Sequence, residues 1–162
     1  MAATNIEDGL QLIGDFMVDK LVKILDIQGH RASGQLQDTM RSVVNSTAKG
    51  FTITIIGKDY AKFVERGTPR GVKVSIEALS EWIETKGIAT GDIDVKSLAF
   101  LIQRKIFKEG TIQFRENKKG FVEVMLDANA TLIFQMVTRL FTEQVALSLS
   151  ETISKNKRIL LE

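Results

Sequence analysis

The segment Phe51–Gly57, FTITIIG, alternates apolar and hydroxyl-bearing side chains, and this alternation constrains the fold more than any other pattern in the chain. Phe51, Ile53 and Ile55 fall on one side of an extended backbone, and two threonines fall on the other. β-Branched residues also favour the extended state. The segment therefore predicts a half-buried strand in a chain whose other apolar patterns are mostly helical.

Apolar residues recur every three to four positions before this strand and predict a helix over about residues 5–27. Thr4 and Glu7 have the spacing of a capping box at its start. Gly9 and Gly14 each weaken a helix by about 1 kcal/mol relative to alanine. The sequence therefore predicts that this helix needs a packing partner.

Local start and stop signals predict the remaining elements. They are a short helix marked by Leu36, Met40, Val43 and Val44, a helical turn capped by Asp59, a helix from Ser75 to Gly87, a helix from Asp94 to Gly110, a β-hairpin with its turn at Asn117–Gly120, and a final helix from about 128 to 154.

These elements predict an α+β fold. In this fold, a small, mostly antiparallel β-sheet is expected to pack against a long N-terminal helix and a long C-terminal helix. The residues from about 72 to 110 are expected to form a helical insertion. A length of 162 residues suits one domain with a sizeable core. We therefore expect a single domain over residues 1–162, with ends that can move.

The composition narrows the class of protein. Hydrophobic residues make up 44% and charged residues 26%, which is typical of a globular protein, and the net charge of +2 points to no polyanion partner. The absence of cysteine excludes disulfides and thiolate chemistry. No secretory signal is recognisable at the start, and the most apolar run, broken by Gln135 and Arg139, is short for a bilayer span. We expect no membrane association.

The residues with catalytic or metal-binding chemistry are few. His30 is the single histidine and lies in a polar segment, where a solvated role is favoured. Asp92 with Asp94, and Asp15 with Asp19, fit helix starts and exposed helical faces better than a cation site or an acid–base pair. The sequence therefore predicts no catalytic, cofactor-binding or metal site, and no enzyme.

The segment GTPRGVKV lacks the G-K-[ST] ending of a phosphate-binding loop, so it predicts a turn and no nucleotide site. Arg66, Arg70 and Lys73 form a local basic patch beside it. A solvated or intersubunit patch is the favoured interpretation. The alternative is a small DNA-binding accessory protein that uses this patch.

The final helix carries apolar residues on more than one face, among them Phe134 and Phe141. A surface helix on one small core needs only one apolar stripe. The additional apolar residues favour burial of this helix against another subunit. The alternative is that the helix is covered on both sides within one subunit.

Two stretches resemble a known family in their order and spacing. ASGQLQDTM at Ala32–Met40 and DYAKFVERGT at Asp59–Thr68 are similar to small tail-completion and head–tail connector proteins of tailed bacteriophages. In that family a tGrLrdSi stretch precedes a strand and a yA.yvE.GT stretch follows it. The matching residues are Gly34, Leu36, Tyr60, Ala61, Val64, Glu65, Gly67 and Thr68.

A second part of the chain is similar to an insertion seen in many of these proteins. It comprises SIEALSEWIETKGI and then SLAFLIQRKIFKEGT, so the resemblance covers about Ala32–Thr111 and a flanking helix at each end. Family members often continue with a proline-aromatic stretch, whereas this chain has TIQFRENKKGFVEV.

The resemblance implies a structural virion protein without enzymatic activity. It implies a sixfold or twelvefold ring of identical subunits at the head–tail junction, made in the cytoplasm of the host bacterium. The implied partners are the portal, an adaptor or stopper and the tail proteins, with non-specific proximity to genomic DNA in the channel.

A ring closes through two different, complementary patches on each subunit. One candidate patch is the final helix, and the other is the Tyr60–Gly71 segment with the lysine-rich turn at Asn117–Gly120. The candidate interface residues are Tyr60, Glu65, Arg66, Arg70, Lys118, Lys119, Phe134 and Phe141.

Overall fold

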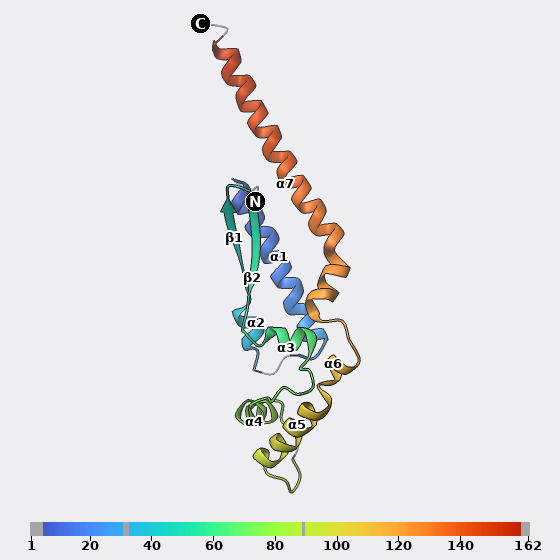
Figure 1. Cartoon of the computed structure of the whole chain (residues 1–162). Helices are drawn as coiled ribbons and strands as arrows, with labels where there is room; N and C mark the ends of the chain where they lie inside the picture. Colours follow the sequence, from blue (N-terminus) through green and yellow to red (C-terminus); the bar gives the residue numbers. More distant parts are fainter. Residues whose placement is uncertain (1–4, 31–32, 89, 160–162) are drawn as a thin grey trace. The chain divides into compact units, whose positions relative to one another are not determined.

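The computed structural model describes residues 5–30, 33–88 and 90–159, with side chains as far as Lys157. Contacts within the chain divide it into two compact units. Unit 1 comprises Met1–Lys20, Arg41–Ile56 and Leu126–Glu162, and unit 2 comprises Leu21–Met40 and Gly57–Met125. Figure 1 follows the chain by colour from the N-terminus in blue to the C-terminus in red. The expectation of a single domain stays a prediction.

Unit 1 combines a two-stranded antiparallel sheet with parts of two long helices. Helix α1 spans Ile6–Ile27, α7 spans Phe121–Ile159, strand β1 spans Arg41–Thr47 and β2 spans Gly50–Ile56. The strands pair in a register that runs from Arg41 with Ile56 to Thr47 with Gly50. The predicted α+β fold, with a long helix at each end and a strand near residues 51–57, is confirmed.

Strand β1 occupies residues for which the sequence predicts a helix. Val43 and Val44 lie in β1, and the preceding helix α2 spans only Gln35–Thr39, so that prediction is wrong. Val44 pairs with Ile53 across the sheet. Cross-strand packing favours β-branched residues, and this gain depends on a partner strand that helical spacing does not register.

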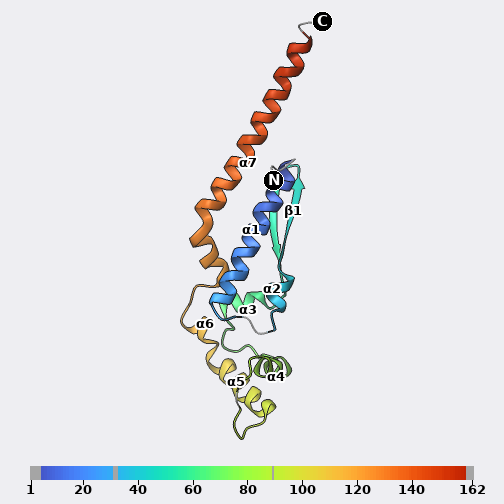
Figure 2. The same cartoon turned by 180° about the vertical axis from the view of Figure 1, so that it is seen from behind.

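The core of unit 1 lies between α1, α7 and the hairpin. Leu10 and Ile13 of α1 and Leu140 of α7 are buried together, and Val44 and Ile53 pack against them. Figures 1 and 2 show α1 beside the hairpin in opposite views. Unit 1 is therefore held together by residues from three separate parts of the sequence.

Gly9 and Gly14 allow close approach to α1. A β-carbon on Gly14 would lie 2.7 Å from Cβ of Ser42 and 3.0 Å from Cγ2 of Ile53. A β-carbon on Gly9 would meet the side chain of Leu140. The predicted packing partner of this helix is therefore confirmed.

The first turn of α1 is capped by Asn5, whose Oδ1 accepts a hydrogen bond of 2.8 Å from the backbone N–H of Asp8. This bond satisfies one of the N–H groups that a helix leaves unpaired at its start. The capping box expected from the sequence depends on Thr4, which lies outside the described residues.

Beyond Leu140, α7 leaves the core of unit 1. The side chains from Val145 to Lys157 are all exposed, and Figure 2 shows this red end continuing past α1 and the hairpin. By length and composition alone, Phe121–Lys157 is long and apolar enough to cross a bilayer. Length and composition alone assign no location, so the expectation of no membrane association stays a prediction.

Unit 2 contains short helices and the ends of the two long ones. Helix α3 spans Ala61–Arg66, α4 spans Ile76–Thr85, α5 spans Val95–Glu109 and α6 spans Ile112–Arg115. Ser75 Oγ accepts the N–H of Ala78, and Asp94 Oδ1 accepts the N–H of Ser97. Both predicted caps are therefore confirmed.

One core cluster of unit 2 lies between α4 and α5. Leu79 and Ile83 of α4 are buried against Ala99 of α5. The buried Gln103 of α5 donates a hydrogen bond of 2.5 Å to the carbonyl of Val74. This bond fastens the start of α4 to the middle of α5.

The predicted β-hairpin with its turn at Asn117–Gly120 is wrong. The residues before the turn form α6, and α7 begins at Phe121 directly after it. The alternating pattern of TIQFR and FVEVM is short, and short apolar runs do not separate helix from strand. Contacts with the distant residue Glu65 decide the conformation of this segment.

Candidate functional site

The stretch DYAKFVERGTPRG, at residues 59–71, forms α3 and the turn that follows it. The expected cap from Asp59 is not formed, because Tyr60 occupies the N-cap position and no side chain caps the helix. Gly67 ends α3 with φ at 75°, a left-handed value that favours glycine. The predicted stop at this glycine is confirmed.

The Gly67–Thr68 pair is bound to the Gly110–Thr111 pair. The backbone N–H of Thr68 donates to Thr111 Oγ1, and the backbone N–H of Thr111 donates to the carbonyl of Thr68, both at 2.9 Å. The turn after α3 is thus joined to the end of α5. The two threonines that the family resemblance quotes are structural partners in this chain.

Glu65 caps the start of α7 within unit 2. Its two carboxylate oxygens accept the backbone N–H groups of Val122 at 2.8 Å and Glu123 at 3.3 Å. A negative charge at a helix N-terminus is favoured by the helix dipole. The Glu65 carboxylate is therefore engaged inside the subunit, and this engagement explains why a helix, not a strand, begins at Phe121.

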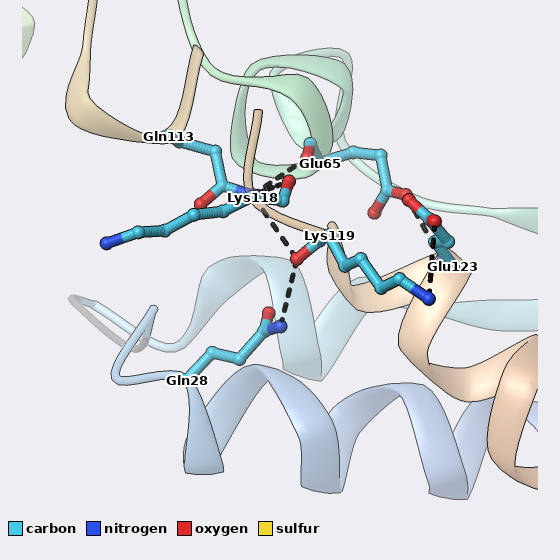
Figure 3. A network of polar contacts seen from close by, with 6 residues as sticks. All are labelled: Gln28, Glu65, Gln113, Lys118, Lys119 and Glu123. Carbon is cyan, nitrogen blue, oxygen red and sulfur yellow. Dashed lines mark hydrogen bonds and ion pairs between the residues drawn. The ribbon is translucent and has the colours of Figure 1, made fainter. Parts of the chain in front are cut away.

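Two glutamines complete this network, which Figure 3 shows. The Nε2 of Gln113 lies 3.2 Å from the carbonyl of Glu65 and 3.0 Å from that of Lys118. The Nε2 of Gln28 donates to the carbonyl of Lys119 at 3.4 Å. Sequence reasoning missed both glutamines, because no local pattern shows that residues 28, 65 and 113 meet.

Lys118 and Lys119 point away from the backbone network that holds them. Lys118 pairs with Glu116 at 2.8 Å and Lys119 with Glu123 at 3.7 Å, and all four side chains are more than half exposed. Exposed pairs of this kind contribute little to stability. Both lysine side chains are therefore paired within the subunit and lie at its surface.

Tyr60, Arg66 and Arg70 lie on the surface of unit 2. The phenol of Tyr60 is 41% exposed, and burial of the remainder, followed by the negative charge of Glu81, raises its pKa. Neither arginine forms an ion pair with a described residue. The two cations are thus exposed and unpaired within the described part of the chain.

Phe134 and Phe141 of α7 have different surroundings in unit 1. Phe141 packs edge-on against Phe51 of β2, with ring centroids 6.4 Å apart, whereas Phe134 is 71% exposed. From Phe141 onward, apolar residues recur every four positions. We call this set the apolar row: Phe141, Val145, Leu149 and Ile153, with exposures between 37% and 66%.

A cavity of about 780 Å³ lies in unit 2 beside α5 and α6. Its walls include Val74, Trp82 and Ile106, and its charged lining residues are all basic: Lys105, Arg115, Lys118 and Lys119. We call this cavity and its cations the basic face. It brings two of the predicted interface residues, Lys118 and Lys119, together with residues that the sequence did not single out.

His30 also lines this cavity and is partly exposed to solvent. Desolvation by burial, and then the positive charge of Lys86, lower its pKa. No group of three or more histidine, aspartate or glutamate residues is placed to hold a metal ion within residues 5–30, 33–88 and 90–159.

Comparisons of the chain with protein-family models, with curated proteins and with solved structures find no match.

Proposed function

We propose that the protein is a structural virion subunit that forms a ring in the head-to-tail connector or tail-completion complex of a tailed bacteriophage. It would join the portal or neck to the tail and would have no enzymatic activity. The observation that carries the proposal is the apolar row on the part of α7 that lies outside the core of unit 1. The sequence resemblance described above supplies the biological setting.

The apolar row is costly to leave in water. Burying a leucine or isoleucine side chain fully gains about 1.5–3 kcal/mol, and Leu149 and Ile153 are 58% and 66% exposed. A helical segment with no packing partner is also marginal in water. A neighbouring subunit that covers the row would stabilise both the helix and the assembly.

The proposal is tested by the mass of the particle in solution. We expect multi-angle light scattering at micromolar concentration to give a multiple of the subunit mass, and electron microscopy to show sixfold or twelvefold rings. Leu149→Asp should release subunits, because it places a charge in the row. Ser150→Asp adds the same charge at the next, exposed position and should leave the mass unchanged.

Three outcomes would contradict the proposal. They are a chain that stays monomeric at these concentrations, absence of the protein from purified virions, and flotation of the chain with neutral lipid vesicles in place of self-association. The last would indicate that α7 enters a bilayer, which its length and composition also fit.

A second candidate, a small DNA-binding accessory protein, is favoured by the exposure of three cations near one turn. Arg66, Arg70 and Lys73 are all exposed and form no ion pair with a described residue. Binding through phosphate contacts would weaken steeply with salt. Titration of a short duplex at low and physiological salt tests this candidate, and no binding at low salt would exclude it.

A further inference from the structure

Unit 2 carries a second hollow with the opposite charge. A groove of about 880 Å³ lies between α4 and α5. Three carboxylates from α4 line it, namely Glu77, Glu81 and Glu84, together with one cation, Lys96. Their spacing of four and three residues places them on one face of the helix. We call this groove the acidic face.

Both faces combine charge with exposed apolar side chains. In the acidic face, Phe100 and Leu101 are each 50% exposed. In the basic face, Ile112 of α6 is 54% exposed. Apolar side chains beside charges of one sign are typical of a surface that another protein covers.

Each hollow is also lined by a residue that has a buried polar atom without a hydrogen-bond partner. Among the described residues, Gln28 Oε1 and Ser80 Oγ are the buried side-chain oxygen or nitrogen atoms that lack a hydrogen bond. Gln28 lines the basic face and Ser80 lines the acidic face. Buried polar atoms are nearly always bonded in folded proteins.

We infer that the basic face of one copy docks against the acidic face of the next copy. Neither face can pair with its own counterpart, because like charges would meet. The lining charges of the two faces are mostly opposite in sign, so a second copy of this chain supplies the charge complement that each face needs. Such a contact is head-to-tail, and head-to-tail contacts build rings when the rotation closes.

This inference rests on the proposed ring and adds a contact that is separate from the apolar row of α7. It gives the ring two kinds of contact. The α4–α5–α6 region supplies charge complementarity and register, and α7 supplies apolar burial.

Two charge-reversal variants test the inference. The first, Glu81→Lys with Glu84→Lys, turns the acidic face basic, and the second, Lys105→Glu with Lys118→Glu, turns the basic face acidic. Each variant then carries two faces of like charge. We expect each alone to require at least a tenfold higher concentration than the parent to assemble, as measured by light scattering.

An equimolar mixture of the two variants should assemble again. Every contact in an alternating ring would then join opposite charges, and rings of six or twelve subunits have the even number that alternation needs. Recovery on mixing also shows that both variants are folded. The matched control is Arg104→Glu with Lys108→Glu, which reverses two exposed charges of α5 outside both faces and should assemble as the parent does.

The results separate the two proposals. If the parent forms rings and both variants assemble equally well, or if the mixture stays monomeric, the docking inference is wrong while the ring stands. A parent that is monomeric throughout overturns both.

Discussion

Thr68 and Thr111 exchange two hydrogen bonds of 2.9 Å, although they are 43 residues apart in the sequence. The backbone of each threonine donates to the other residue, once to a hydroxyl and once to a carbonyl. This exchange joins the turn after α3 to the end of α5, so the stretch that resembles phage connector proteins has a structural role inside unit 2.

Thr111→Val should destabilise unit 2 by about 1–3 kcal/mol, because it leaves the backbone N–H of the buried Thr68 without its acceptor. Urea unfolding followed by the fluorescence of Trp82, which lies in unit 2, measures the change. Thr111→Ser keeps the oxygen and should recover most of the loss. Equal losses for the two variants would contradict a role for this hydrogen bond.

Gly67→Ala and Gly71→Ala both strain the backbone, and Gly67→Ala also adds crowding. Both glycines have positive φ, at 75° and 82°. A β-carbon on Gly67 would lie 2.5 Å from the backbone nitrogen of Phe114, whereas Gly71 faces open space. We expect Gly71→Ala to cost about 1–2 kcal/mol from the left-handed backbone alone. Gly67→Ala should cost clearly more in the same unfolding assay, and a smaller or equal cost would show that Phe114 moves freely.

Glu65→Ala should lower the free energy of unfolding of unit 2 by about 1 kcal/mol through loss of the cap and its charge at the start of α7. Glu65→Gln keeps an acceptor for Val122 but removes the charge, so it should fall between the parent and the alanine variant. Glu151→Ala, in the exposed part of α7, is the matched control and should have little effect.

Local sequence signals were sufficient to predict the helices and strands whose ends are set by nearby residues. Ser75 and Asp94 start α4 and α5 where their hydrogen-bonding side chains indicate, and the alternation around Ile53 identifies β2. Gly67 and Gly110 end their helices at the predicted positions. In each case the deciding interaction lies within a few residues of the element.

The failed predictions depend on partners distant in sequence. Val44 is extended because it pairs with Ile53, and α7 starts at Phe121 where Glu65 caps it. The basic face likewise brings Gln28 and Lys105 together with the turn before α7. The pattern of residue types describes one segment of the sequence at a time. It could therefore predict that Lys118 and Lys119 are exposed, but it could not predict the cavity that they line.

His30 gives unit 2 a stability that depends on pH. Its pKa in the folded chain lies below the ordinary value of about 6.5, first because of burial and then because of Lys86. Below that ordinary value the unfolded chain binds a proton that the folded chain resists, so stability falls as pH falls.

We therefore expect the urea midpoint of the parent to decrease between about pH 7.5 and pH 5.5. His30→Gln cannot titrate and should show a flatter profile over this range. Asp94 and Glu77, whose pKa values are lowered, affect stability only at more acidic pH. An identical decrease in the variant would place the pH dependence elsewhere.

Phe134 and Phe141 lie one heptad apart on α7, and the structure predicts different effects on stability for their removal. Phe141→Ala should lower the stability of unit 1 by about 1 kcal/mol or more, because it removes the edge-on contact with Phe51. Phe134→Ala removes a side chain that is 71% exposed, so stability should change by no more than about 0.5 kcal/mol. If Phe134 is an interface residue, the same variant should weaken self-association in light scattering. Loss of stability without loss of assembly would instead place Phe134 in the fold and remove it from the interface.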